Sequence, residues 1–322
     1  MINKVSIIIC CYNSAQKLQK TLEHLANQRI SDNIKFEVVV VDNASIDNTG
    51  EVAKLIWEQL DSPIPLRVVS EKKAGLVYAR ICGVKTAKHD LLIFCDDDNW
   101  LREDYVQNAV DIMNNNPTIG VLGGQSVLAP HIEAPEWWEE YQGNYAVGKQ
   151  LSETGLANHR GFLYGAGLVT RKSIAERVFD SEYPLLLTGR KGSECLSGED
   201  WEYCQRTLLL GNNLFYSENL FYWHDVAEER LTKEKLNQLI RSLDVAKIIG
   251  ERYNYVQQFY RKSRISKALL LLKRTINYLF AETARRNRKL ELLKYHTKLC
   301  GFDYSKDEEL DIIIGWLKKH NL

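Results

Sequence analysis

Short runs of β-branched and other apolar residues recur in the first hundred positions and predict buried strands. These runs occupy residues 5–9, 36–41, 66–69 and 91–95. Continuous apolar runs of this length suit a parallel sheet that is covered on both faces. Leucines at helical spacing, or helix-like segments, separate them at residues 16–28, 49–60 and 75–86. The alternation predicts four strands joined by three crossover helices, which is half of a doubly wound α/β domain.

The pattern becomes less regular after residue 120. Short strands are predicted at 121–124 and 164–170, and a stretch rich in glycine, serine and charge covers 188–198. These features indicate a mixed sheet with binding loops. From about residue 228 the chain is helical, with no strand signal. We therefore expect an α/β domain over 1–227, with halves 1–119 and 120–227, and a helical C-terminal region over 228–322.

Composition excludes some classes of partner. The 322 residues hold 42 basic and 42 acidic side chains, so the net charge is zero and nothing indicates nucleic acid. The seven cysteines are an odd number with no CxxC pair, which favours reduced, buried thiols. No signal sequence precedes the first strand, and no apolar run approaches the roughly 18 residues of a spanning helix. A cytoplasmic protein is the expectation.

Positive charge is concentrated in one part of the helical region, residues 261–298. This segment contains twelve basic residues and only two acidic ones, Glu282 and Glu291. The basic residues alternate with apolar runs such as 269–272. A basic amphipathic helix can lie in an anionic membrane interface. The same pattern suits a solvated charged face on helices that pack against the first domain. Both interpretations stay open at this point.

Three consecutive carboxylates, Asp96, Asp97 and Asp98, follow the fourth predicted strand. Adjacent like charges repel, so a divalent cation such as Mg²⁺ or Mn²⁺, with a diphosphate supplying further oxygens, is their natural partner. An acidic loop or a helix cap is the plainer alternative. The position favours the metal, because open α/β sheets bind ligands at the carboxyl ends of their strands.

A second acidic pair, Glu199 and Asp200, precedes a predicted amphipathic helix over 201–210. A carboxylate at a helix N-terminus tends to stay ionised, as a general base for a hydroxyl group must. Helix capping explains the same pair without any chemistry. Taken alone, the pair does not separate these alternatives.

The order of these motifs resembles that of the family 2 glycosyltransferases. The resemblance covers residues 4–225 and rests on segments 5–13 and 40–49, on Gly75 with Ala79 and Arg80, on 96–98, and on Glu199 with Asp200. It implies a GT-A-like, doubly wound mixed sheet with a helical C-terminal extension. It further implies an inverting transferase that moves a sugar from a nucleotide donor, here expected to be a UDP-sugar, to a hydroxyl group.

The resemblance also assigns roles to individual positions. It implies that the first half binds the nucleotide sugar through Cys10, Tyr12, Asn13, Asp42, Asn43, Arg80, Asp96 and Asp97. Asn43 stands where many relatives have an acid, and Ile81 replaces an asparagine after Arg80. Asp98 and His224 would hold Mn²⁺ or Mg²⁺. Asp200 would be the catalytic base.

Residues expected at the acceptor side lie mostly in loops. The set comprises aromatic side chains that could stack on a sugar and polar groups near the base: Trp100, Trp137, Trp138, Arg190, Lys191 and Glu199. Tryptophans are more often buried than exposed, so the Trp137–Trp138 pair is the stronger candidate. Arg190 and Lys191 could clamp a phosphate when their loop closes.

Two other functions fit parts of the pattern. A metal-dependent nucleotidyltransferase would need a glycine-rich basic loop after the first strand, where this chain has Cys10 to Ser14 without glycine. A non-catalytic nucleotide- or sugar-binding module would have no need for Asp200. The basic segment 261–298 and the lack of a spanning helix lead us to expect a glycan or lipid-linked acceptor at the inner membrane face, in polysaccharide biosynthesis.

Overall fold

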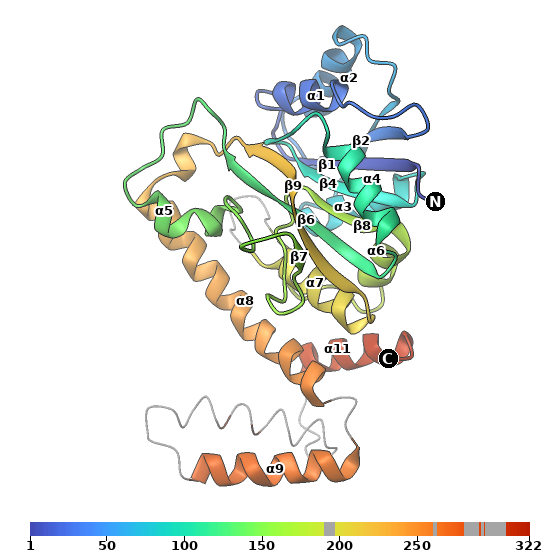
Figure 1. Ribbon diagram of the computed structural model, residues 1–322. Coiled ribbons are helices and arrows are strands. Elements are labelled where there is room, and N and C mark those ends of the chain that lie inside the picture. Colours follow the sequence, from blue (N-terminus) through green and yellow to red (C-terminus); the bar gives the residue numbers. More distant parts are fainter. Residues whose placement is uncertain (190–196, 260–262, 280–289, 291–292, 294–306) are drawn as a thin grey trace. The chain divides into compact units, whose positions relative to one another are not determined.

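The four strands predicted in the first hundred residues all form, as β1 (Lys4–Cys11), β2 (Lys35–Asn43), β3 (Leu66–Glu71) and β4 (Leu91–Asp96). They pair in parallel in the spatial order β3-β2-β1-β4. The crossover helices are α1 (Leu18–Ala26), α2 (Thr49–Gln59) and α3 (Leu76–Thr86). Figure 1 shows the computed structural model, which describes residues 1–189, 197–259, 263–279, 290, 293 and 307–322.

The sheet continues beyond β4 with antiparallel and parallel partners. β8 (Leu168–Arg171) pairs antiparallel with β4, and β6 (Ile119–Leu128), β9 (Asn213–His224) and β5 (Asn99–Leu101) follow in that order. The short β7 (Gly155–Leu156) pairs with β9. This mixed nine-stranded sheet confirms the expected mixed α/β class. The long strand β9 was not predicted as one element, and helix α4 (Tyr105–Asn115) was not predicted at all.

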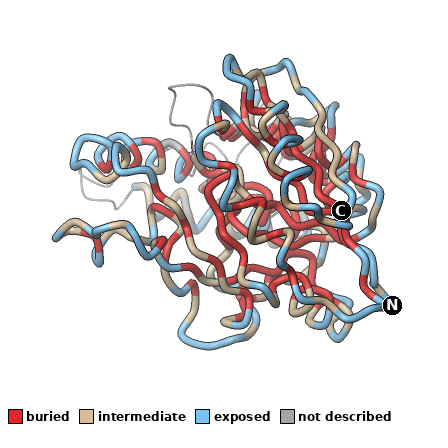
Figure 2. The backbone as a smooth tube through the Cα atoms, turned by 90° about the horizontal axis from the view of Figure 1, so that it is seen from above, coloured by how far each residue is buried: buried red, intermediate tan, exposed pale blue. Residues whose placement is uncertain are grey.

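Helices cover both faces of the sheet, which explains why the parallel strands are apolar at every position. Val5, Ile7 and Ile9 of β1 belong to a core shared with α1, α2 and α4. Ile8 points to the other face, where α3, α6 (Lys172–Val178) and α7 (Glu199–Leu209) pack. The central strands are buried along most of their length (Figure 2). A three-layer α/β/α domain results.

The strand order reverses between β1 and β4, and the loops after these two strands lie side by side. Cys10 of β1 is in register with Asp96 of β4. Ligands of open α/β sheets bind outside the carboxyl ends of strands at such a reversal. The fold therefore brings Tyr12 and Asn13 to the same edge as the three aspartates.

The C-terminal part consists of helices in the residues that the structure describes. The short η2 (Glu228–Arg230) is followed by α8 (Lys233–Phe259), α9 (Arg264–Leu279) and α11 (Glu308–Lys319). The chain divides into a unit of Met1–Asp244 and a unit of Val245–Leu322. The boundary expected at residue 227 stays a prediction. None of the described helices is long and apolar enough to cross a bilayer.

Candidate active site

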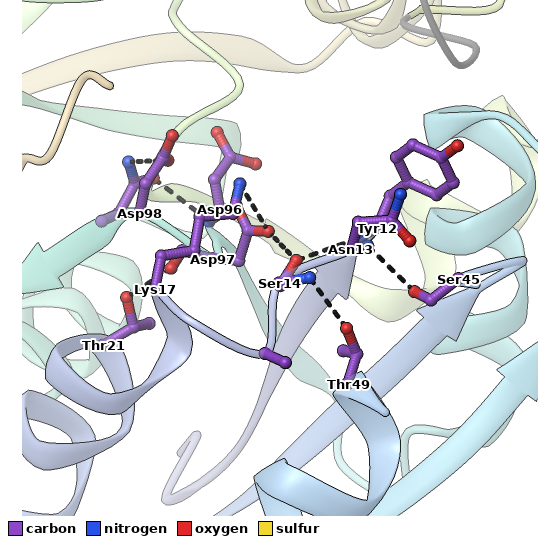
Figure 3. Close-up of polar contacts among 12 residues, drawn as sticks. Tyr12, Asn13, Ser14, Lys17, Thr21, Ser45, Thr49, Asp96, Asp97 and Asp98 are labelled. Carbon is purple, nitrogen blue, oxygen red and sulfur yellow. Dashed lines mark hydrogen bonds and ion pairs between the residues drawn. The ribbon is translucent and has the colours of Figure 1, made fainter. Parts of the chain in front are cut away.

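The loops that follow β1 and β2 are tied together by short-range polar contacts (Figure 3). Asn13 donates its backbone N–H to Ser45 Oγ at 3.0 Å, and its Oδ1 accepts from the backbone N–H of Ile46 at 2.9 Å. Ser14 donates its backbone N–H to Thr49 Oγ1 at 2.8 Å. Asn13 has a φ of 51°, a left-handed conformation that asparagine adopts more readily than most residues. These contacts hold the edge of the sheet rigid on the side of Tyr12.

The middle aspartate, Asp97, is committed to the loop after β1. Its carboxylate accepts a hydrogen bond from Ser14 Oγ and lies 3.0 Å from Lys17 Nζ, while its carbonyl accepts from Thr21 Oγ1 at 2.8 Å. Burial, with the charge of Asp98, raises the pKa of Asp97 to about 6 although Lys17 opposes the shift. In this structure the Asp97 carboxylate therefore anchors the loop, and its predicted contact with the nucleotide sugar stays a prediction.

Asp42 and Asn43, at the end of β2, differ in what they contact. Asn43 donates its amide hydrogens to the carbonyl oxygens of Glu71 and Lys73 and accepts from the backbone N–H of Gly75 at 2.8 Å. It thus fixes the loop between β3 and α3. Asp42 Oδ1, by contrast, is buried without a hydrogen-bond partner among the described residues. An unpaired buried acceptor is costly, so Asp42 is suited to receive a donor from a ligand.

Asp98 meets His224 because β5 and β9 pair next to the aspartates. Asn99 of β5 is in register with His224 of β9, and Asp98 Oδ1 lies 3.5 Å from His224 Nε2. Arg230 Nη1 lies 3.5 Å from Asp98 Oδ2. Burial disfavours the charged carboxylate, but His224, Arg230 and Lys17 outweigh it and hold the pKa of Asp98 well below its usual range. Asp98 is therefore ionised at neutral pH.

The donor set around Asp98 fits a divalent ion whose coordination a substrate completes. His224 Nδ1 is buried without a hydrogen-bond partner among the described residues, and the other ring nitrogen faces Asp98. No group of three or more His, Cys, Asp or Glu side chains in the described part of the chain could hold a metal ion. Mg²⁺ sites commonly use one or two carboxylates together with substrate phosphates and water. Asp98 and His224 match that kind of incomplete protein site.

Asp200 lies at the N-terminus of α7 and is held by two backbone groups. Its Oδ1 accepts from the N–H of Trp201 at 2.7 Å and its Oδ2 from the N–H of Gly165 at 3.0 Å. Burial raises the pKa of Asp200, and the charge of Asp96 adds to the rise, whereas Arg80 and the two backbone hydrogen bonds oppose it. Arg80 lies 5.3 Å from the ring centre of Phe94 on β4 and 3.7 Å from Glu199 at the start of α7, so these two elements are close to each other here.

Cys10, Tyr12 and Arg80 occupy different environments around this site. Tyr12 is 43% exposed, so its ring is available to a ligand. Burial raises the pKa of the Cys10 thiol to about 12, and this side chain is neutral at physiological pH. Arg80, expected near the nucleotide, is only 3% exposed. The cysteines at 10, 11, 82, 95 and 204 are free thiols, while Cys195 and Cys300 lie outside the described residues.

The aromatic candidates at the acceptor side are more buried than expected. Trp100 lies between the rings of His24 and His131, with centroid distances of 5.8 and 5.7 Å. Trp138 is 6% exposed and packs on Tyr145. Trp137, at intermediate burial, keeps more of its surface free. Sugar stacking by these side chains stays a prediction, and Trp137 is best placed for it.

Arg190 and Lys191 lie outside the described residues.

Three side chains that contact the site, Ser14, Lys17 and Arg230, were not predicted. Lys17 and Ser14 precede α1 in a stretch with no recognisable motif, and Arg230 follows two glutamates, which makes it look like a surface residue. Only the pairing of strands and loops reveals their contacts with Asp97 and Asp98.

The mixed sheet, with acidic residues at the carboxyl ends of its strands, has the GT-A fold of glycosyltransferases. The chain is similar to the crystal structure of S. aureus TarS 1-349 in complex with UDP, at 16% identity and a TM-score of 0.52 over 92% of this chain and 80% of TarS 1-349. The complex with UDP-GlcNAc gives 19% identity and a TM-score of 0.52 over 98% and 80%. At such identities the likeness establishes the fold.

The chain belongs to glycosyl transferase family 2, whose sequence pattern it matches over residues 6–179, more than half its length. It is 23% identical over 239 residues to glycosyltransferase GlyA of Streptococcus pneumoniae, covering 72% of this chain and 32% of GlyA. Glycosyltransferase AglE of Haloferax volcanii is 24% identical over 221 residues, covering 68% and 66%. The chain thus spans less than two thirds of these relatives. Membership of this family confirms the resemblance from which a glycosyltransferase was expected.

Proposed function

We propose that the protein is an inverting glycosyltransferase that moves a sugar from a UDP-sugar to a hydroxyl group of a glycan or lipid-linked acceptor. One observation carries the proposal: Arg80 lies against Phe94 of β4 and against Gly165, whose N–H holds Asp200, so the Asp200 carboxylate lies near the strand end that carries the three aspartates. The reaction needs one carboxylate to hold a cation at the leaving nucleoside diphosphate and another to take the proton of the attacking hydroxyl group. Both must lie in one site.

The nucleotide would bind across the carboxyl ends of β1, β2 and β4. Tyr12 offers an exposed ring, and Asp42 Oδ1 is an unpaired acceptor for a base N–H. Asp96, whose side chain is partly exposed at the end of β4, is suited to the ribose hydroxyls. The UDP and UDP-GlcNAc complexes of TarS support uridine as the base, on the ground of a shared fold.

The chemistry would use residues on opposite sides of the sugar. Asp98 and His224 would hold Mn²⁺ or Mg²⁺, which when bound neutralises charge on the diphosphate. Asp200 would accept the proton of the acceptor hydroxyl group as its oxygen attacks the anomeric carbon. Attack from the face opposite the nucleotide gives the inverted configuration and needs no covalent intermediate. Arg230, beside Asp98, would supply further positive charge to the leaving group.

The decisive experiment compares the wild type with Asp200→Asn. Asparagine keeps the shape and can still accept from one of the two N–H groups, those of Trp201 and Gly165, but it cannot take a proton. We expect turnover of UDP-sugars to fall by about 10²- to 10⁴-fold, the usual effect of removing a general base. UDP affinity should be unchanged. Asp111→Asn, on the exposed face of α4, serves as control.

We also propose that the enzyme works at the cytoplasmic face of a membrane, in polysaccharide biosynthesis. Helix α9 supports this, because five of its apolar side chains are exposed at helical spacing: Ile265, Leu269, Leu272, Ile276 and Leu279, each 46% exposed or more. A stripe of this kind, beside basic residues such as Lys273, suits an anionic lipid surface. A lipid-linked acceptor would be presented at that surface.

A further inference from the structure

Arg80 is a buried cation on helix α3 with an acidic side chain beside it, that of Glu199. The side chain is 3% exposed. A buried charge is costly unless other charges or hydrogen-bonding groups compensate it. Its partners therefore indicate what the residue does.

The partners of Arg80 lie at the start of α7 and next to it. Arg80 Nη1 is 3.7 Å from Glu199 Oε1, and its guanidinium carbon lies 5.3 Å from the centre of the Phe94 ring. A Cβ placed on Gly165 would come within 2.7 Å of Arg80 Nη2 and 3.1 Å of Asp200 Cβ. Arg80 and Asp200 thus flank the same glycine, whose N–H holds Asp200 Oδ2.

The charges around Arg80 are those of the proposed reaction site. Burial lowers the pKa of Arg80, but the carboxylates of Glu199, Asp96 and Asp200 stabilise its positive charge and raise that pKa overall. In return, Arg80 is the largest influence that opposes the raised pKa of Asp200. Asp96 lies at the end of β4 and Glu199 at the start of α7, so one guanidinium group electrostatically connects the two halves of the domain.

We infer that Arg80 is a positioning residue for the base: through its contacts with Glu199 and with the turn at Gly165 it orients the Asp200 carboxylate. This inference rests on the proposed function, in which Asp200 takes the acceptor proton. It differs from the role that the family resemblance implies for Arg80, which is contact with the nucleotide. Gly165 is part of the same arrangement, because a side chain at this position would displace Arg80 or Asp200.

A second buried arginine on the same side of the sheet provides a matched control. Arg206 of α7 is fully buried, lies 3.5 Å from Glu202 and donates to the carbonyl oxygens of Val178, Tyr183 and Pro184. Val178 ends α6, Tyr183 and Pro184 lie in the loop that follows it, and Glu202 is on α7, so none of these partners is among the residues assigned to the site. Arg206→Gln should therefore lower stability without changing how activity depends on pH.

The test measures Arg80→Gln and Arg80→Lys in the full chain, with three readouts: the pH profile of kcat/KM, the division of the effect between kcat and KM, and UDP binding by calorimetry with Mn²⁺. In Arg80→Gln the acid limb of the kcat/KM profile should move to higher pH by about one unit or more. The reason is that a nearby positive charge lowers the pKa of a carboxylate such as Asp200 by that amount, and the variant removes this charge. We expect kcat at neutral pH to fall at least about tenfold through misplacement of the base. UDP affinity and donor KM should change by less than about threefold, since the lost interaction is not with the donor.

Arg80→Lys keeps the charge and should recover much of the acid limb. Several other titratable groups act near Asp200: Asp96 at the end of β4, Glu199 on the same helix, Tyr164 before β8 and Cys204 one turn along α7. Glu199→Gln tests most directly whether Arg80 acts on Asp200 through Glu199. If it does, the effects of Glu199→Gln and Arg80→Gln on the pH profile should not add. Additive effects would contradict the inference.

The outcomes separate this inference from the proposed function. If the wild type and Asp200→Asn turn over UDP-sugars equally, the proposed function fails. If Asp200→Asn is inactive but Arg80→Gln keeps the wild-type acid limb and kcat, only the role of Arg80 is wrong. Loss of UDP binding in a folded Arg80→Gln variant would assign Arg80 to the nucleotide instead. Circular dichroism and thermal melts, compared with Arg206→Gln, identify a variant that fails to fold, for which Arg80→Lys carries the test.

Discussion

At the scale of single residues, the site separates carboxylates by environment. Asp98 lies beside His224 and Arg230, which favour its charged form. Desolvation, with a smaller contribution from the charge of Asp96, disfavours the charged form of Asp200, so its pKa is raised. Two titratable groups whose pKa values are shifted in opposite directions are typical of sites in which one group acts as an acid and the other as a base. Here Asp98 is suited to bind a cation and Asp200 to accept a proton.

The raised pKa of Asp200 predicts a pH dependence. A general base works only when ionised, so kcat/KM falls as the pH drops through the pKa of Asp200. Because burial raises that pKa, the midpoint of the acid limb should lie above 3.8, the value of an unperturbed aspartate. Steady-state kinetics over a range of pH measure it, with Asp111→Asn as control. A limb at or below 3.8 would contradict the assignment of the base.

At the scale of elements, close packing of α3 on β1 decides where Arg80 lies. A Cβ on Gly83 of α3 would come within 2.3 Å of Ile8 Cγ2, so only glycine allows the helix to approach the strand at this point. Arg80 lies one turn before Gly83 on the same helix. The position of the guanidinium group therefore depends on a glycine in the core.

Gly83→Ala should accordingly destabilise the protein by about 1–3 kcal/mol, the usual cost of inserting a methyl group into a packed core. Urea unfolding followed by circular dichroism measures the change. Gly155→Ala is the matched control, because a Cβ on Gly155 meets nothing within 4 Å. Equal stability of the two variants would show that α3 can shift away from β1 without cost.

The apolar stripe on α9 makes a second prediction at this scale. Replacing Leu269 and Leu272 together with glutamate should weaken binding to phosphatidylglycerol vesicles by at least about tenfold, since each buried leucine contributes about 1.5–3 kcal/mol. Sedimentation with vesicles measures the effect. Ile248→Glu on α8, where the isoleucine is 57% exposed, is the control for added charge. A wild-type protein that does not sediment with the vesicles would exclude the membrane role.

At the scale of the whole molecule, the metal site is expected to be incomplete without the donor. In the proposed site Asp98 and His224 would be two ligands, and a diphosphate would add the rest. Mn²⁺ and UDP together should therefore raise the free energy of unfolding by more than the sum of their separate effects. At a free ligand concentration of 100 Kd the increase is about 2.7 kcal/mol.

Asp98→Asn tests this coupling by thermal melts. The variant should lose the additional stabilisation that Mn²⁺ gives in the presence of UDP, and it should keep the smaller effect of UDP alone. Asp111→Asn should behave like the wild type. If Mn²⁺ alone stabilises the wild type as strongly as Mn²⁺ with UDP, the protein holds a complete metal site of its own, contrary to this prediction.

The sequence alone determined the parallel half of the sheet and the positions of the acidic motifs. Apolar runs at 5–9, 36–41, 66–69 and 91–95 predict strands because residues buried on both faces must be apolar throughout. Asp96 to Asp98 follow the last of these runs, and the rule for open sheets then assigns them to the ligand edge. These conclusions depend on local pattern, so they required no coordinates.

Only the tertiary structure decided how each side chain is used. The pairing of β5 with β9 brings His224 to Asp98, residues far apart in the chain. Arg80 of α3 lies 3.7 Å from Glu199 at the start of α7, a contact that its motif did not indicate, and its predicted contact with the nucleotide stays a prediction. Local sequence cannot encode such contacts, because burial and electrostatic environment arise from segments that meet only when the chain is folded.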